Sequence, residues 1–250
     1  MAIDLNAIRN RLDSLQTKTT KTDNLWKPKP GKQQVRIVPY VHNPSNPFIE
    51  LFFHYNFGGK NILSPSTHGE ADPLLEFAEQ LKSTGDRNDW NLSKQLTPKM
   101  RTYVPVLVRG EESEGVKFWG FGKTVYQELL GIIADPDYGD ISDATTGRDI
   151  VVERQTPAEA GNQYGKTTIR VKPNVTALSD DSNLLQRLLD EQPDIKELYQ
   201  EPTFDELKSH LSNFLNPSDS TEETTEKEPE MVTTEGSSNV EDDFDKLFNS

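Results

Sequence analysis

The segment from Lys99 to Ile133 constrains the fold most, because it places two β-type runs directly ahead of a helical one. The runs Thr102–Arg109 and Val116–Gly122 are rich in β-branched and aromatic residues and flank a loop of glycines and acids. Two such runs predict a β-hairpin, and the apolar spacing after Lys123 predicts a helix. The remaining elements must therefore be arranged around this hairpin.

Each strand of the hairpin has two chemically different sides, because successive side chains of a strand point to opposite faces. In both strands one side carries cations and aromatic rings, and in the first strand the other side is a row of valines. We expect the two cationic and aromatic sides to form one surface that holds phosphates and stacks unpaired bases. The hairpin thus predicts single-stranded nucleic-acid binding through Lys99, Arg101, Tyr103, Lys117, Trp119, Phe121 and Lys123.

The same residues fit a second interpretation, in which Trp119 and Phe121 belong to the core beneath a covering element. Aromatic residues are common in any strand, and Lys and Arg often lie on solvated faces. Pro105 has no N–H for a ladder, so it places the first strand at an edge or a bulge, which fits both interpretations. Periodicity alone leaves the binding face and the core face open.

Composition limits the class of protein. A chain of 250 residues can bury one sizeable core with tails. It has no apolar run of about 18 residues and no secretory N-terminus, which predicts a location in the cytoplasm and no membrane contact. The sequence contains no cysteine, so disulfides, thiolate nucleophiles and cysteine-ligated zinc are excluded.

The net charge of −14 is unevenly distributed. Residues 216–250 contain 11 acidic residues against two lysines and account for −9, so residues 1–215 carry only −5. Residues 25–49 contain three lysines and Arg36 and no acid, which is typical of a segment that contacts a phosphate backbone. We therefore add Arg36 to the predicted DNA-binding residues, together with the aromatic residues Tyr55 and Trp90.

Residues 1–22 are predicted to form an arm. Five apolar residues between Ile3 and Leu15 have near-helical spacing, and the polar segment 17–23 separates them from the start of the globular domain. A helix with its own apolar stripe needs a partner surface, which is either the core of the same molecule or a neighbouring molecule. In the second case the arm would set cooperativity through self-association along DNA.

Residues 23–215 are expected to form one core domain of the α+β class. Strand signals lie at Gln34–Tyr40, Phe48–Phe57, Asp149–Glu153 and Thr167–Lys172, in addition to the hairpin. Helix signals lie at Pro73–Leu81, 182–199 and 203–215, the last with Thr203 and Glu206 at capping-box spacing. Five or so strands with an intervening helix predict an OB-fold-type β-barrel with added helices.

Residues 216–250 are predicted to be a disordered acidic tail, because they are rich in Ser, Thr, Glu and Pro and have few large apolar residues. The final segment VEDDFDKLF spaces Phe244, Leu247 and Phe248 among acids, which is typical of a recognition peptide. We expect the tail to bind partner proteins and to compete with DNA phosphates for the cationic surface.

No catalytic site is expected. The residues Gly120, Gly122, Lys123 and Thr124 imitate the end of a P-loop, but Lys117 stands where that loop needs its first glycine. His54 and His68, with Glu70 or Asp72, form no recognised metal-ligand spacing. Two alternatives to DNA binding stay open at this point: a protein-interaction adaptor, whose basic stretch and tail both contact proteins, and a P-loop-like ATPase.

Several motifs, taken in order, resemble the single-stranded-DNA-binding (helix-destabilising) proteins of T-even-type bacteriophages. They are Trp26-Lys27, Val35–Pro39, Ser66–Gly69, Lys99–Tyr103, Phe121–Lys123 and Phe204–Leu207. The resemblance spans about residues 25–215 and implies an OB-fold core with cooperative, sequence-tolerant binding of single-stranded DNA. It also implies a role in viral DNA replication, recombination and repair, with replication and recombination proteins as partners.

The best-known member of that family binds structural zinc through one His and three Cys. His54 matches the His, whereas Ser64, Asp72 and Leu75 stand at about the positions of the Cys residues. The resemblance therefore implies a zinc-free variant without a cofactor. The segment Pro73–Leu81 would then hold residues 60–82 by burying Leu74, Leu75, Phe77 and Leu81, at about 1.5 to 3 kcal/mol for each fully buried side chain.

Overall fold

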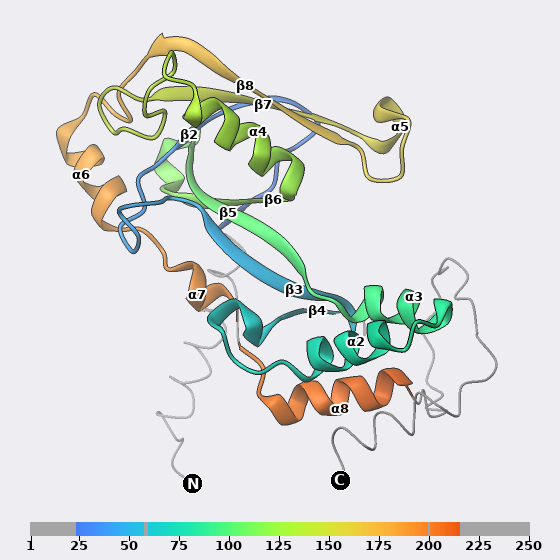
Figure 1. The fold of residues 1–250 in the computed structure, drawn as a ribbon. Helices are drawn as coiled ribbons and strands as arrows, with labels where there is room; N and C mark the ends of the chain where they lie inside the picture. The colour runs from blue at the N-terminus through green and yellow to red at the C-terminus, as the bar shows by residue number, and fades with distance from the viewer. Residues whose placement is uncertain (1–23, 58–59, 200, 216–250) are drawn as a thin grey trace, which may run out of the picture. The chain divides into compact units, whose positions relative to one another are not determined.

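The computed structural model describes residues 24–57, 60–199 and 201–215 (Figure 1). These residues fall into two compact units. Unit 1 contains residues 24–51 and 100–199, and unit 2 contains residues 52–57, 60–99 and 201–215. The predicted arm and the predicted acidic tail both lie outside the described residues, so those two predictions remain untested.

Unit 1 is built on a mainly antiparallel sheet with the strand order β1-β6-β5-β2-β7-β8. Only the β1–β6 pair in this order is parallel. The strands are β1 (Leu25–Trp26), β2 (Gly31–Ile37), β5 (Lys99–Val108), β6 (Lys117–Phe121), β7 (Arg148–Gln155) and β8 (Lys166–Val175). The described sheet is open, since β1 and β8 end the order without pairing with each other. The α+β class is confirmed, whereas the described strands do not close into the barrel of the predicted OB-fold-type core.

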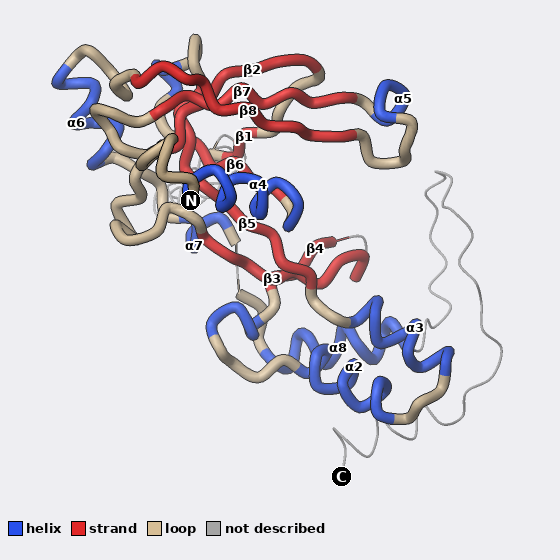
Figure 2. The backbone as a smooth tube through the Cα atoms, turned by 45° about the horizontal axis from the view of Figure 1, so that its top comes forward, coloured by secondary structure: helices blue, strands red, loops and turns tan. Residues whose placement is uncertain are grey.

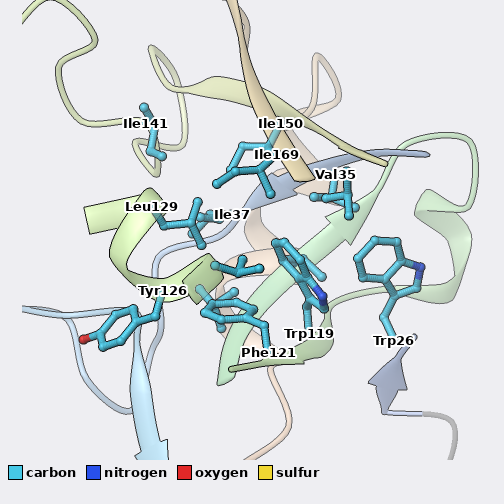
Figure 3. Close-up of a cluster of buried hydrophobic side chains, with 14 of the residues drawn as sticks. Trp26, Val35, Ile37, Trp119, Phe121, Tyr126, Leu129, Ile141, Ile150 and Ile169 are labelled. Atoms are coloured by element: carbon cyan, nitrogen blue, oxygen red, sulfur yellow. The ribbon is translucent and has the colours of Figure 1, made fainter. Parts of the chain in front are cut away.

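The core of unit 1 lies between one face of this sheet and the helix α4 (Lys123–Ala134). Alternate strand residues point into it, among them Val35 and Ile37 of β2 and Ile150 of β7 (Figure 3). Val152 of β7 is buried in the same cluster. A second apolar cluster joins β2 and β5 to α6 (Ser182–Asp190) through Val38, Leu107, Val116, Leu178 and Leu188. The short elements of unit 1 are η2 (Glu112–Glu114), α5 (Pro157–Ala160) and α7 (Ile195–Leu198).

Unit 2 contains three helices that lie side by side (Figure 2). They are α2 (Pro73–Ser83), α3 (Arg87–Leu96) and α8 (Phe204–Leu215). Aspartates at the N-caps, Asp72 for α2 and Asp86 for α3, accept hydrogen bonds from two backbone N–H groups each. The unit also contains the short helix η1 (Pro65–His68), β4 (Lys60–Leu63) and most of β3 (Ile49–Phe57), which pairs with β4.

Most of the predicted elements are confirmed, including the hairpin, the helix after it and the helix at Pro73. The helix α2 buries Leu74, Phe77 and Leu81 as expected, while Leu75 is only half-buried. The capping box of α8 is present, since Thr203 and Glu206 exchange backbone and side-chain hydrogen bonds. The helix expected over 182–199 is divided into α6 and α7, and Pro193 lies between them. None of the described helices is long and apolar enough to cross a membrane.

Candidate nucleic-acid interface

The pairing register of β5 and β6 contradicts the predicted cationic and aromatic surface. Val104 lies directly opposite Trp119, and Tyr103 lies opposite Gly120. Residues directly opposite each other in an antiparallel pair share a face, and a shift of one residue moves every side chain to the other face. Trp119 and Phe121 therefore lie on the valine side of the hairpin, away from Arg101 and Tyr103, and the prediction of one shared surface is wrong.

Trp119 and Phe121 are core residues. Trp119 is 1% exposed and Phe121 is 5% exposed. The Trp119 ring makes edge contacts with Trp26 and Phe121, at centroid distances of 5.6 and 4.7 Å (Figure 3). A base cannot stack on a ring that is packed on all sides, so the core interpretation holds for both residues.

The opposite face of the hairpin is covered as well. Tyr103 is buried, and its hydroxyl lies 2.6 Å from the hydroxyl of Tyr199. Arg101 is half-buried, and its Nη2 donates to the carbonyl of Gly120 at 2.8 Å. A Cβ at residue 120 would lie 2.6 Å from the Tyr103 ring, so only glycine fits there. Tyr103 is thus held by neighbours within unit 1, whereas Arg101 retains partial access to solvent.

Arg36 is a buried structural residue rather than a contact for phosphates. Its Nη1 donates to Asp149 at 3.2 Å, and Arg109 donates to the same carboxylate at 2.9 Å. Burial lowers the pKa of Arg36, and the charge of Asp149 opposes that effect. In the sequence, Asp149 directly precedes the apolar residues Ile150–Val152. An acid beside a strand of this type indicates a buried carboxylate that needs a cationic partner such as Arg36. The prediction that Arg36 faces DNA is therefore wrong.

Besides Arg101, four predicted residues without an ion pair to another described residue remain at least partly exposed. Lys99 begins β5, Lys123 begins α4, Tyr55 is half-buried in β3, and Trp90 projects from α3. Lys117 is partly exposed, but it forms an ion pair with Glu114 three residues earlier. The strand β6 runs to Phe121 and α4 begins at Lys123, which leaves no flexible phosphate-binding loop at the P-loop-like residues.

Trp90 is the most accessible of the predicted aromatic residues, with 48% of its surface exposed. It lies on α3, whose sequence is too polar to give the apolar spacing on which helix prediction depends. The ammonium of Lys94 lies 3.3 Å from the centroid of the Trp90 ring. Arg87, one turn earlier on the same side of the helix, is also exposed. This arrangement places a stacking surface beside cations, as single-strand binding requires.

The residues at the family's zinc position form a hydrogen-bonded network. His54 and Asp72 are fully buried, with 2.8 Å between Nε2 and Oδ2. The other ring nitrogen, Nδ1, lies 2.7 Å from the carbonyl of Leu96. Ser64 donates its hydroxyl to the same Asp72 oxygen, and Asp72 Oδ1 caps α2 through the N–H groups of Leu74 and Leu75.

These residues do not fit a tetrahedral zinc site. Zinc needs a lone pair on the histidine and three further ligands, but both nitrogens of His54 already have partners and Leu75 has no ligating atom. No group of three or more His, Asp or Glu that could hold a metal gathers within the described ranges. His68, also considered as a ligand, lies 3.9 Å from Glu201 instead.

The network also lowers the pKa of Asp72. Burial alone would raise the pKa of Asp72, but hydrogen bonds from His54 and Ser64 and the charge of His54 together bring it below its ordinary value. The Leu96 carbonyl can only accept, so Nδ1 of His54 donates to it, and Nε2 of the same ring faces the Asp72 carboxylate.

Comparison with known proteins agrees with the resemblance seen in the sequence. Residues 29–216 match a family model whose description is gp32 DNA binding protein like. A search of curated proteins finds no match. The matched residues cover both units and most of the chain. A domain of this family fits an OB-type fold, and the match supports single-stranded DNA as the partner. The family is a DNA-binding family and not an enzyme family. The chain therefore belongs to the gp32-like family of single-stranded-DNA-binding proteins.

Proposed function

We propose that this protein binds single-stranded DNA without strong sequence preference, and that Trp90 and Lys94 on α3 form part of the contact. The family match carries the proposal, and the exposed Trp90 ring beside a cation supports this location. Every base has a π-face, so stacking on an indole tolerates any sequence, and nearby cations add attraction for phosphates.

In unit 2, Lys99 and the aromatic residue Tyr55 are further residues of the proposed contact. In unit 1, Arg101 and Lys123 are proposed separately as cations that contact phosphates. Lys99 and Lys123 are exposed, whereas Arg101 and Tyr55 are half-buried. Among the described residues no ion pair involves Lys99, Arg101 or Lys123, which leaves their charges available to phosphates. Trp119, Phe121, Tyr103, Arg36 and Lys117 are excluded from the proposed contact because each is buried or paired.

We expect replacement of Trp90 by alanine to weaken the binding of oligodeoxythymidylate by roughly 5- to 100-fold, since one stacked base contributes about 1 to 3 kcal/mol. The folded state should be unaffected, because the ring lies on the surface. Fluorescence tests this directly. The protein has three tryptophans, and Trp26 and Trp119 are buried, so quenching by DNA should be lost in Trp90→Ala.

The matched control is Phe204→Ala, which removes another exposed aromatic ring from unit 2. Its affinity for the oligonucleotide should equal that of the unchanged protein. If Trp90→Ala binds as well as the unchanged protein and keeps the quenching signal, Trp90 is not part of the contact. If the unchanged protein shows no salt-dependent binding of single-stranded DNA, the adaptor alternative replaces the proposed function.

The proposal extends to the cellular role. We place the protein in viral DNA replication, recombination and repair in the host cytoplasm, as the resemblance to the phage family implies. Residues 1–22 would bind a neighbouring copy and so make binding cooperative along DNA, and Phe244, Leu247 and Phe248 would contact replication and recombination proteins. The absence of zinc is part of the same proposal, supported by the poor fit of His54, Asp72 and Ser64 to a metal.

We expect the acidic tail to compete with DNA. Residues 216–250 carry a net charge of −9, and a tethered segment has a high effective concentration near the cations of its own molecule. Removal of residues 217–250 should raise affinity for single-stranded DNA most at low salt, and the gain should shrink as ionic strength rises. Anisotropy titrations at several salt concentrations measure this. Equal affinities of the full and truncated chains at the lowest salt would contradict the competition.

A further inference from the structure

The strands β2, β7 and β8 have a solvent-exposed face that the contacts proposed above do not use. Lys32 lies opposite Glu153, which lies opposite Thr168. Gln34, Val151 and Arg170 form the next row in the same way, and Gln155 lies opposite Lys166. None of these side chains is buried, whereas the residues that alternate with them on β7 and β8 include the core residues Val152 and Ile169. We call the eight residues the outer face: Lys32, Gln34, Val151, Glu153, Gln155, Lys166, Thr168 and Arg170.

The outer face is cationic, and its two cations on β8 have no ion-pair partner among the described residues. Its one acid, Glu153, forms an ion pair with Lys32 at 3.8 Å. Arg170 lies opposite Val151 and Lys166 lies opposite Gln155, so both cations have uncharged cross-strand neighbours. In the described part of the chain no ion pair involves Lys166 or Arg170. Their charges are therefore available to an external anion.

An exposed aromatic ring stands at the end of the same two strands. β7 and β8 run side by side to α5 (Figure 1), and Tyr164 follows α5 with 77% of its surface exposed. No other large apolar side chain of the described residues is as exposed. Tyr164 precedes Lys166 by two residues, so an aromatic ring and the two cations Lys166 and Arg170 follow one another along the chain.

The backbone holds Tyr164 in place. Its N–H donates to Asn162 Oδ1 at 2.9 Å, and its carbonyl accepts from Arg154 Nη2 at 2.7 Å. Gly165 has a φ of +71°, and a Cβ there would lie 2.4 Å from the carbonyl of Gln155. Glu159, the acid nearest in sequence, is bonded to Thr156 in a capping box. A ring on a fixed backbone loses little conformational entropy on binding, which favours contact with a ligand.

We propose that the outer face and Tyr164 form a second contact for single-stranded DNA, in which Lys166 and Arg170 bind phosphates and Tyr164 stacks on a base. The inference rests on the proposed function and adds a site to it. Lys166 and Arg170 lie about 13 Å apart along the strand, far enough to contact different phosphates. The combination of unpaired cations with an exposed aromatic ring is what a sequence-tolerant single-strand surface requires.

The stacking part is tested with Tyr164→Ala and Tyr164→Phe in the full-length protein, by anisotropy with a long oligodeoxythymidylate. Tyr164→Ala should bind roughly 5- to 100-fold more weakly, as expected for loss of one stacked base. Tyr164→Phe should bind like the unchanged protein, because stacking does not need the hydroxyl. An equal loss in both variants, or no loss in either, would overturn the stacking role.

The phosphate part is tested with the double variant Lys166→Gln, Arg170→Gln. The slope of log affinity against log salt should fall in magnitude by about 1.4, since each single-strand phosphate contact contributes about 0.7. The control is Arg187→Gln, Lys196→Gln, which removes two exposed cations of unit 1 outside the outer face and should leave the slope unchanged; Arg187 forms an ion pair with Glu191 on the surface. Equal slopes in the two double variants would overturn the phosphate role.

The two proposals fail separately. If the unchanged protein binds and Trp90→Ala weakens it, while the Tyr164 and outer-face variants bind normally, the second contact is wrong and the proposed function stands. If the unchanged protein does not bind single-stranded DNA, both are wrong. If the outer-face variants alter self-association in sedimentation but not affinity for the oligonucleotide, the face contacts protein and the inference is overturned.

Discussion

Replacing Trp119 by alanine should destabilise unit 1 by about 3 to 5 kcal/mol, as expected for deletion of a large aromatic ring from a core. The ring is 1% exposed and contacts both Trp26 and Phe121, so its removal leaves a cavity that the strands cannot close. A typical domain has only about 5 to 15 kcal/mol of stability, so the loss is a large fraction of the total. Urea denaturation followed by circular dichroism measures it.

Trp90→Ala is the matched control, because it deletes the same side chain from a surface position. Its free energy of unfolding should change by no more than about 0.5 kcal/mol. The two variants should therefore behave in opposite ways: Trp119→Ala loses stability, and Trp90→Ala loses DNA binding. A Trp119→Ala protein with normal stability and weakened binding would restore the prediction that Trp119 faces DNA.

Replacing Asp72 by alanine should destabilise unit 2 by about 3 to 5 kcal/mol, because it leaves the buried side chains of His54 and Ser64 without their hydrogen-bond partner. Asp72 also caps α2, and loss of a cap alone costs about 1 kcal/mol. Asp86→Ala isolates that smaller effect, since Asp86 caps α3 through the same two types of hydrogen bond but is exposed. The difference between the two variants measures the contribution of the pair with His54.

Asp72→Asn tests the arrangement of protons in the same network. The amide oxygen can still cap α2, and the amide nitrogen can donate to a neutral His54 and to Ser64, so this variant should lose much less stability than Asp72→Ala. Unfolding in the presence of EDTA should match unfolding without it in all three proteins. A chelator that lowers the stability of the unchanged protein would contradict the zinc-free proposal.

The pH dependence follows from the lowered pKa of Asp72. A carboxyl whose pKa is lower in the folded state contributes stability above its unfolded pKa, near 3.8, and loses that contribution as the pH falls through the folded pKa. Unit 2 should therefore lose stability on the acid side of about pH 4. Asp72→Asn should lack this part of the acid dependence. Identical acid profiles for Asp72→Asn and the unchanged protein would contradict the ionised pair.

The sequence predicts the helices and strands of this fold better than it predicts how they pair and pack against each other. Hydrophobic periodicity locates the hairpin, α2 and α4, because each has a clear apolar side. It does not locate α3, where only Ser93 and Leu96 are buried and the other faces are polar. The pairing register of the hairpin also cannot be predicted from the sequence. A shift of one residue exchanges the two faces of a strand, and the acidic loop between β5 and β6 does not determine the register.

The predicted DNA-binding residues are partly wrong for the same reason, because periodicity does not show which elements pack against each other. Trp119 and Trp90 have identical side chains, and only tertiary packing decides that one fills the core and the other meets solvent. Arg36 is similar, because its partner Asp149 lies 113 residues away in the sequence. His54 and Asp72 are scattered polar residues in the sequence, and the fold of unit 2 brings them together with Ser64. Long-range contacts of this type leave little signal in a single sequence.

The strand β1 is the first element of unit 1 that a pulling force on the chain ahead of Asn24 would reach. It is two residues long, lies at the sheet edge and directly follows residues 1–23 and Asn24. A few hydrogen bonds join this end of the chain to β6, among them the one from the Phe118 N–H to the Asn24 carbonyl at 2.7 Å. The Trp26 ring also packs against Trp119. A force on the chain ahead of Asn24 would load these bonds first, so β1 is the element of unit 1 that we expect to detach first.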